Sequence, residues 1–374
     1  MVYLDYSATT PVNDLVLESF NKVCKEYPGN PNSLHKLGLK SKKLMDAATE
    51  KVAKILNVKE NEIIFTSGAS ESNNLAIKGV INNSCGKTII TTKLEHSSIL
   101  STVNYLKQNG YTIKYVKIKD NGQVDLEDLE KLIDKDTILV SIAEVNSEIG
   151  IIQNVNEIGK ILKKYERVLF HVDGTQAIGK KHINLDNIDL YSFSAHKIYG
   201  LKGVGVLVKK ENISLIPIIH GGKSQTIYRS GTPALPLIVS TSKALSLMYE
   251  NLDKKIDYVK KLNVMLKEGL KKIDSVTINS NENCIPHILN ISINNIKPET
   301  LLHALEEDEI YISTKTACSS SESISLAVYT LTKDTKLSST SIRISLSHLT
   351  TKEEIFYFLD KLEKNIKKLE SIGN

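Results

Sequence analysis

The residues best suited to chemistry follow short apolar runs of the sequence. His96, Asp173 and Lys197 each stand at the end of such a run, and they supply an imidazole, a carboxylate and a primary amine. A lysine amine condenses with an aldehyde to a Schiff base, and an imidazole can shuttle protons. One residue of this kind is more often a satisfied structural group. Several of them at the ends of neighbouring predicted strands favour catalysis.

Pyridoxal phosphate requires this combination of side chains. A lysine holds its aldehyde, and an Asp on the pyridinium nitrogen lets the ring accept the electrons of a carbanion. We therefore predict that Lys197 forms the Schiff base and that Asp173 pairs with the ring nitrogen. His96 would stack on the ring, and Gln176, three residues after Asp173, would hydrogen-bond the phenolic oxygen.

A candidate phosphate cradle follows Phe65. The segment Thr66-Ser-Gly-Ala-Ser-Glu71 places a glycine-containing turn before a predicted helix, so that backbone N–H groups and hydroxyls can converge on an anion. The same residue types form ordinary helix N-caps, which is their commoner use. Ser194 and His196, which flank the lysine, would join the cradle.

Strands and helices alternate between residues 62 and 208. Apolar or β-branched runs typical of strands lie at residues 62–65, 88–91, 112–116, 137–142, 167–172, 190–193 and 205–208, and helical patterns lie at residues 75–80, 97–108 and 155–165. This alternation predicts an α/β fold, with a mostly parallel sheet covered by helices on both faces. Ligands of such sheets sit beyond the carboxyl ends of the strands.

The flanking segments predict a second, smaller domain. A helical pattern at residues 40–58 precedes the sheet, and lysine-rich helices at 239–248 and 256–273, a strand at 288–293 and a last helix at 353–369 follow it. The length of 374 residues fits about two domains. We predict a large α/β domain over residues 14–250. Residues 1–13 and 251–374 would form a small α+β domain.

The composition is that of an ordinary globular protein. Hydrophobic residues make up 41% and charged residues 24%, which excludes a disordered chain. The net charge of +5 is mild, and we expect no direct binding of nucleic acid. No apolar run approaches the ~20 residues of a membrane helix, and the N-terminus lacks the pattern of a secretion signal. We expect a cytoplasmic protein without membrane contact.

The four cysteines are scattered and lack CxxC spacing. They are Cys24, Cys85, Cys284 and Cys318. This spacing predicts neither a zinc site nor a disulfide framework, so we expect no metal.

The sequence resembles one known family over nearly its whole length, the NifS/IscS-like cysteine desulfurases. These belong to the class V group of fold-type I pyridoxal phosphate enzymes. The motifs that carry the resemblance are Tyr3-Leu-Asp-Tyr-Ser-Ala-Thr-Thr-Pro11, Gly29-Asn-Pro-Asn-Ser33 with His35, Phe65-Thr-Ser-Gly-Ala-Ser-Glu-Ser72, Glu95-His96, His171-Val-Asp173, Ser194-Ala-His-Lys-Ile-Tyr-Gly200, Arg229-Ser-Gly-Thr232, Ala317-Cys318 and Ser341-Ile-Arg-Ile-Ser345.

The resemblance implies a fold-type I transferase that is a homodimer with a shared active site. Its activity would be the conversion of L-cysteine to L-alanine, with the sulfur passed to an enzyme cysteine as a persulfide. A sulfur-acceptor protein would then take the sulfur for iron–sulfur cluster assembly or for tRNA or cofactor thiolation.

The resemblance also implies roles for individual residues, and it repeats those given above for Lys197, Asp173, Gln176 and His96. Phosphate contacts would come from Ala69, Ser70, Ser194 and His196, and from Thr232 across the dimer interface. Arg343 would bind the substrate carboxylate as a bidentate pair, helped by Asn146 and Asn30.

Cys318 would be the nucleophile of this reaction. It lies in the polar stretch Ser313-Thr-Lys-Thr-Ala-Cys-Ser-Ser-Ser-Glu-Ser323, which suits a mobile loop better than a core position. Lys315 nearby would favour the reactive thiolate. We predict that Cys318 is functional and that the other three cysteines are structural.

Three segments depart from the family pattern. The second Asn of the family's Asn-Asn-Glu segment contacts the cofactor, and here it is Ser147, which would make a shorter contact or use a water. Lys315-Thr316 replaces Gly-Ser before Ala-Cys, and the Gly-rich stretch is only partly kept in His220-Gly-Gly-Lys-Ser-Gln225. The departures suggest a specialised branch with a different sulfur acceptor.

Two alternatives stay open. A class V aminotransferase or a selenocysteine lyase would use the same cofactor without an essential thiol, and Cys318 argues against it. An inactive scaffold would keep the fold alone. The intact Lys197, Asp173, His96 and Arg343 argue against the scaffold.

Overall fold

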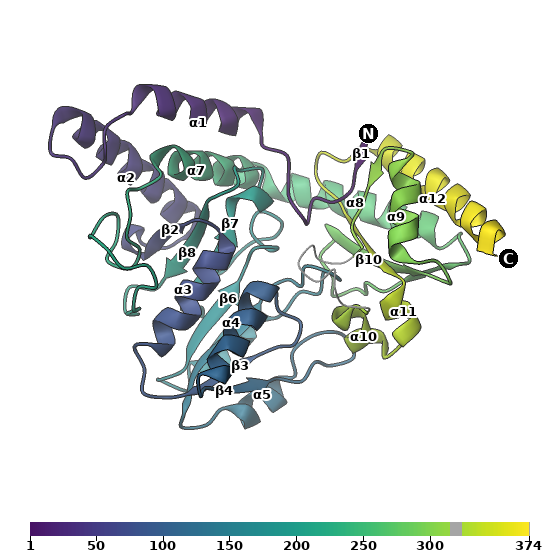
Figure 1. The fold of residues 1–374 in the computed structure, drawn as a ribbon, viewed down its shortest axis with the longest axis horizontal. Coiled ribbons are helices and arrows are strands. Elements are labelled where there is room, and N and C mark those ends of the chain that lie inside the picture. Colours follow the sequence, from purple (N-terminus) through teal and green to yellow (C-terminus); the bar gives the residue numbers. More distant parts are fainter. Residues whose placement is uncertain (315–323, 374) are drawn as a thin grey trace.

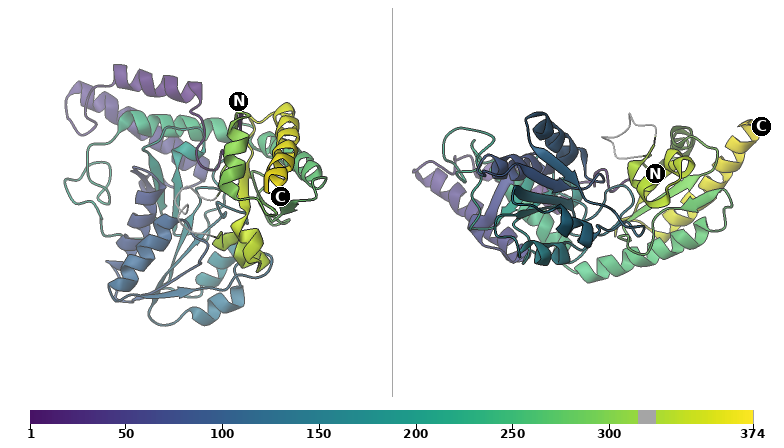
Figure 2. Two further views of the ribbon diagram at one scale, coloured as in Figure 1. Left: turned by 45° about the vertical axis from the view of Figure 1, so that its right-hand side comes forward. Right: turned by 90° about the horizontal axis from the view of Figure 1, so that it is seen from below.

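The computed structural model describes residues 1–314 and 324–373 (Figure 1). It contains a seven-stranded sheet, here called the large sheet, and a three-stranded antiparallel sheet, called the small sheet. Both chain termini lie on the side of the small sheet (Figures 1 and 2). Within the described residues, no helix combines the length and the apolar character that a membrane crossing requires.

The large sheet has the strand order β2-β8-β7-β6-β5-β3-β4. β8 pairs antiparallel with β2 and β7, and the other neighbours pair parallel. This confirms the predicted mostly parallel sheet. The strands are β2 (Ile63–Thr66), β3 (Thr88–Thr91), β4 (Thr112–Tyr115), β5 (Thr137–Ala143), β6 (Leu169–Asp173), β7 (Leu190–Ser194) and β8 (Gly205–Lys209).

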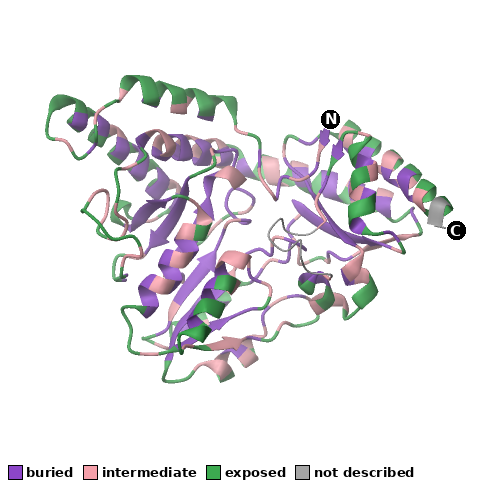
Figure 3. Ribbon diagram, in the orientation of Figure 1, coloured by how far each residue is buried: buried purple, intermediate pink, exposed green. Residues whose placement is uncertain are grey.

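Helices cover both faces of the large sheet because successive strand residues point to opposite sides. Ile63 and Phe65 pack in the core with α2, α6 and α7, whereas Ile64 between them packs with α3 and α4. The strands of the large sheet are largely buried except the edge strand β4, and much of α1 is exposed (Figure 3). The helices are α1 (Asp14–Glu26), α2 (Lys36–Leu56), α3 (Ala69–Ile81), α4 (Ser97–Gln108), α5 (Leu126–Leu132), α6 (Val155–Leu162) and α7 (Leu235–Tyr249), with single 3₁₀ turns η1 (Glu60–Glu62) and η2 (Ala195–Lys197).

The small sheet has the order β12-β10-β9. Ile342 and Ile344 of β12 pack in one core with residues of α8 and α12. Its elements are β9 (Val276–Ile278), β10 (Ile288–Ile293) and β12 (Ser341–Ser345), with α8 (Leu252–Leu270), α9 (Pro298–Glu306), α10 (Leu326–Thr332), α11 (Thr335–Ser339) and α12 (Lys352–Gly373). α7 packs on α1 and α2, and α8 packs on α12. The domain boundary near residue 250 stays a prediction.

The N-terminal segment links the two sheets. β1 (Val2–Tyr3) pairs parallel with β11 (Ile310–Tyr311), and Val2 and Leu4 belong to the core beside the small sheet. The chain then crosses toward the large sheet, where the Thr10 N–H donates to the His196 carbonyl at 3.0 Å. In Figure 1 this crossing is the purple segment between β1 and α1. It brings residues 5–10 past the carboxyl end of β7.

Gly174, directly after β6, packs against the ring of Tyr191. A Cβ at residue 174 would lie 1.8 Å from Cζ of Tyr191. Tyr191 is only 1% exposed, and its hydroxyl donates to Oε2 of the buried Glu144 at 2.8 Å. The ring therefore has no room to move away from an added methyl group.

We predict that Gly174→Ala lowers the free energy of unfolding by about 3 kcal/mol or more, as overpacking of a rigid core does. Adding Tyr191→Leu should recover part of this loss because it removes the atoms that clash. Urea unfolding of both variants checks the prediction, with Gly222→Ala as the control, since a Cβ there meets no atom within 4 Å. Wild-type stability of Gly174→Ala would contradict it.

Candidate active site

A cavity of about 570 Å³ lies beyond the carboxyl ends of β5, β6 and β7. This volume is typical of small-molecule sites, which span roughly 300–1,000 Å³. The cavity brings together most of the residues predicted from the sequence: Ala69, Ser70, His96, Asn146, Ser147, Asp173, Gln176, Ser194, His196, Lys197 and Arg343. Residues 7–9 and Lys202 also line it, and the sequence had not indicated a role for them.

Three predicted residues are not placed in this cavity. Asn30 is exposed in the loop between α1 and α2, where its Oδ1 accepts from the Asn32 N–H at 2.9 Å. Thr232 is exposed between β8 and α7. Its predicted role requires a second subunit and stays a prediction. Cys318 and the neighbouring Lys315-Thr316 lie outside the described residues.

The N-terminus of α3 opens onto the cavity. Gly68 precedes the helix at φ +158 and has no side chain that could cap the first turn. The Ala69 N–H lies 3.4 Å from the Ser194 hydroxyl, one of the predicted phosphate contacts. The Thr66 hydroxyl contacts the Ser72 hydroxyl at 2.7 Å and donates to the Gly68 carbonyl at 3.0 Å, so it braces the turn before the helix. The backbone approaches closely here, because a Cβ at Gly205 would lie 2.5 Å from the Gly68 carbonyl carbon. These features favour the anion cradle over the ordinary cap.

Asp173 is held in place by two donors. Its Oδ1 accepts from the Thr175 N–H at 3.0 Å, and its Oδ2 accepts from Nδ2 of the buried Asn73 at 2.8 Å. Asn73 Nδ2 also lies 2.9 Å from the Ser98 hydroxyl of α4. Asn73 thus fixes the carboxylate from the neighbouring helix, and sequence reasoning missed it, because an Asn on a helix face has no distinguishing spacing.

His96 is the N-cap of α4. Its Nδ1 accepts from the Ser98 N–H at 3.1 Å. A neutral imidazole then carries its proton on Nε2. Burial lowers the pKa of His96; Asp173 acts in the opposite direction and Lys197 adds to the lowering. The residue is therefore set to be neutral near pH 7.

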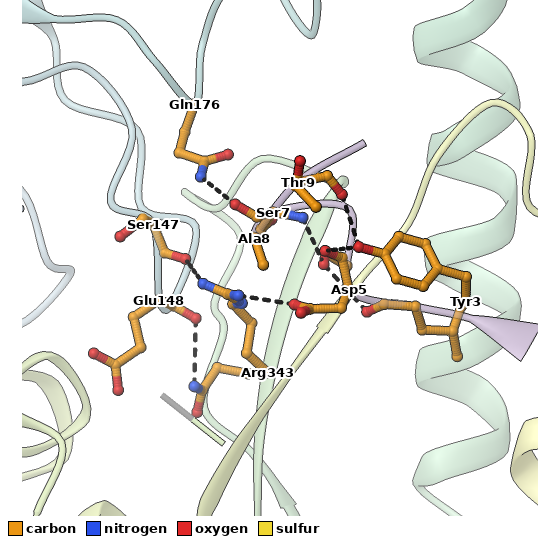
Figure 4. A network of polar contacts seen from close by, with 12 residues as sticks. Tyr3, Asp5, Ser7, Ala8, Thr9, Ser147, Glu148, Gln176 and Arg343 are labelled. Atoms are coloured by element: carbon orange, nitrogen blue, oxygen red, sulfur yellow. Dashed lines mark hydrogen bonds and ion pairs between the residues drawn. The ribbon is translucent and has the colours of Figure 1, made fainter. Parts of the chain in front are cut away.

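Lys197 meets the N-terminal segment. Its Nζ donates to the Ser7 carbonyl and, at 2.7 Å, to the Ala8 carbonyl. His196 contacts the Thr9 hydroxyl through Nδ1 at 3.1 Å. Figure 4 shows residues 7–9 passing close to Gln176. Residues 7–9 therefore form a wall of the cavity. Their backbone carbonyls make the contacts with Lys197.

Arg343 enters the cavity from β12 and is 2% exposed. Its two terminal nitrogens donate to the Ser147 carbonyl and to Oδ1 of Asp5, both at 2.9 Å (Figure 4). Ser147, predicted as a cofactor contact, thus supports the arginine with its backbone. Asn146 Oδ1 accepts from the N–H groups of Glu148 and Ile149, each at 2.9 Å. Its side chain therefore also shapes this loop.

Glu95 is a buried carboxyl beneath the site. Oε1 accepts from the Thr92 hydroxyl at 2.7 Å and Oε2 from the Ala143 N–H at 2.8 Å. Burial raises the pKa of Glu95 to about 8, and the Asp173 charge adds to the rise.

The described residues contain no group of three or more His, Cys, Asp or Glu side chains that could hold a metal ion.

Glu95 should make the stability pH-dependent. Because its folded-state pKa lies above 4.5, its contribution is complete below pH 4.5 and is lost as the pH rises through about 8. Glu95→Gln keeps the geometry and removes the ionisation. At ~1.4 kcal/mol per pKa unit, we expect the wild type to lose more than about 2 kcal/mol relative to this variant between about pH 5 and about pH 9. Parallel pH profiles of urea unfolding would contradict this.

Known proteins resemble the chain over its full length. A sequence model of the aminotransferase class-V family matches residues 2–358. The cysteine desulfurase IscS of Dictyoglomus turgidum is 40% identical, over 100% of this chain and 96% of its own. A solved structure of a NifS-like protein superposes with a TM-score of 0.93 at 39% identity, covering 98% of this chain and 99% of that one.

A further solved structure, of SspA in complex with cysteine, has a TM-score of 0.83 at 30% identity, covering 94% of this chain and 100% of that one. The matching residues, the fold and the cavity agree. The chain belongs to the class V aminotransferase family, within its group of IscS- and NifS-like cysteine desulfurases.

Proposed function

We propose that the protein is a pyridoxal phosphate-dependent cysteine desulfurase, which converts L-cysteine to L-alanine and passes the sulfur to Cys318. The observation that carries the proposal is the convergence of Lys197, Asp173, Arg343 and the N-terminus of α3 on one cavity. The full-length relatives support the same activity.

The residues of the cavity fit pyridoxal phosphate. The backbone of Ala69 and Ser70, with Ser194 and His196, would hold the phosphate, since a helix N-terminus attracts anions. Asp173, fixed by two donors, would pair with the ring nitrogen. When bound, the cofactor supplies an aldehyde that links to an amine and a ring that accepts electrons.

Substrate binding falls to the buried guanidinium of Arg343. Asp5 and the Ser147 carbonyl use one N–H of each terminal nitrogen. A guanidinium has five N–H groups, so donors remain for a carboxylate. We assign an assisting role to Asn146, which lines the same cavity, and Ser147 would contact the cofactor from the same loop.

Proton transfer is assigned to Lys197 and His96. Nζ of Lys197, when it is not linked to the cofactor, would take the proton from Cα of the substrate. Nε2 of His96 carries the proton of a neutral imidazole, because Nδ1 accepts from Ser98. It is therefore the atom that can exchange a proton with a molecule in the cavity.

Sulfur transfer requires the thiolate of Cys318. Its sulfur forms an S–S bond with the substrate sulfur while the substrate Cβ–S bond breaks. The remaining three-carbon amino acid takes up a proton and leaves as alanine, so cysteine and one thiol give alanine and one persulfide. A thiolate is the nucleophilic form of cysteine.

We further propose a homodimer, in which the partner subunit's Thr232 completes the phosphate site. A sulfur-acceptor protein would take the persulfide sulfur, for iron–sulfur cluster assembly or for tRNA or cofactor thiolation. A cytoplasmic location without direct nucleic-acid binding fits this role. A thiol-independent lyase or aminotransferase is the second candidate. The two candidates differ in whether turnover requires the thiol of Cys318.

Cys318→Ala should lower alanine formation from L-cysteine by at least about 100-fold, because the acceptor of the sulfur is gone. The bound cofactor should keep its absorbance band, since Lys197 is intact. Cys24→Ala, on the exposed surface of α1, is the matched control. Unchanged turnover of Cys318→Ala would favour the thiol-independent lyase.

Arg343→Lys should raise KM for L-cysteine by about tenfold or more, since a bidentate guanidinium contact is replaced by a point charge. Steady-state kinetics should show a smaller change in kcat than in KM. Cysteamine, which lacks the carboxylate, should bind both proteins equally. A KM for L-cysteine within about twofold of the wild type would contradict the assignment.

A further inference from the structure

Lys180 is a buried lysine beside the cavity that has no role in the reaction proposed above. It is 7% exposed, although a lysine is costly to bury without a partner. Its Nζ donates to Oε1 of Gln176 at 2.6 Å. Gln176 lines the cavity, so Lys180 contacts the site through this amide.

The hydrogen bonds of Gln176 fix which end of its amide points where. Nε2 donates to the Ser7 carbonyl at 3.0 Å (Figure 4). The two ends of an amide are nearly equal in size, so its partners decide its orientation. A carbonyl only accepts and an ammonium only donates, so Ser7 and Lys180 select the same orientation. Nε2 has two hydrogens, and the second stays available to a molecule in the cavity.

The charges around Lys180 do not explain why a lysine is there. Burial lowers the pKa of Lys180 to about 7, and Lys197 and Arg343, both cations, add to the lowering. Burial lowers the pKa of His287, and the charge of Lys180 adds to the lowering. Both the ammonium and the neutral amine carry N–H groups, so the hydrogen bond to Gln176 is possible in either form. What the position requires is a donor.

We propose that Lys180 is a positioning residue that holds the Gln176 amide with its N–H, and not its C=O, toward the phenolic oxygen of bound pyridoxal phosphate. The inference rests on the proposed function, because only the cofactor brings that oxygen into the cavity. A reversed amide would place an oxygen against an oxygen.

The test compares two ligands of the cofactor-free protein, pyridoxal phosphate and its 3-deoxy analogue, which lacks the phenolic oxygen. Equilibrium dialysis gives both dissociation constants. Lys180→Met removes the donor and should weaken binding of pyridoxal phosphate by about fivefold or more, the effect of one lost hydrogen bond. Binding of the analogue should change by less than about twofold, because the contact does not exist for it.

Three further variants sharpen the comparison. Lys180→Gln restores a neutral donor and should return binding to within about threefold of the wild type. In its ionised form the Lys180→Glu side chain only accepts, so this variant should reverse the amide and selectively weaken binding of pyridoxal phosphate. Lys181→Met is the control: Lys181 pairs with the buried Glu144 and does not line the cavity.

Selective weakening in Lys180→Met and Lys180→Glu, with recovery in Lys180→Gln, supports the inference. Equal weakening of both ligands, or wild-type binding of both, overturns it. If Lys180→Met does not fold, Lys180→Glu against Lys180→Gln gives the same decision. Failure of the wild type to form alanine from cysteine overturns the desulfurase proposal separately, since the binding comparison uses no turnover.

Discussion

The buried guanidinium of Arg343 is the group on which the cavity depends. A charge that is 2% exposed is stable only where acceptors surround it. The acceptors come from Ser147 and Asp5, which lie 196 and 338 residues away in the sequence. One side chain thus joins β12, the loop after β5 and the N-terminal segment. Separation of the two sheets would remove the Ser147 carbonyl from this buried guanidinium, so that hydrogen bond ties the small sheet to the loop after β5.

The N-terminal segment extends this connection to the other end of the cavity. After Asp5, the carbonyls of Ser7 and Ala8 accept from Lys197, and Ser7 also accepts from Gln176. The same few residues therefore touch the groups assigned to substrate and those assigned to cofactor. Because backbone atoms make these contacts, they depend on the path of the chain more than on the side chains. That path is set by the pairing of β1 with β11 and by the bond from Thr10 to His196.

The sequence could predict the elements whose apolar residues follow a regular period. The strands at 88–91 and 288–293 have the predicted bounds, because polar residues flank short β-branched runs. α1 was not predicted; it buries Val16 and Val23 but exposes Leu15 and Leu17. The site residues at strand ends could be predicted because parallel strands bring their carboxyl ends together. The contacts of Asn73 and Lys180 could not, because they depend on tertiary approach and leave no spacing signal.

The charges of the cavity wall link the fold to its ligand. Lys197 and Arg343 line the cavity and Lys180 lies behind Gln176; burial lowers the pKa of Lys180, and the charges of Lys197 and Arg343 add to the lowering. Asp5 and Asp173 offset them in part, but each carboxylate is already committed to specific donors. A ligand that carries a phosphate, a phenolic oxygen and a carboxylate would relieve the remaining repulsion. Such a ligand binds the folded state and not the unfolded state, so its binding free energy adds to the stability of the fold. The buried cations that make the cavity costly without a ligand are therefore the same groups that would select the proposed anionic cofactor and amino-acid substrate.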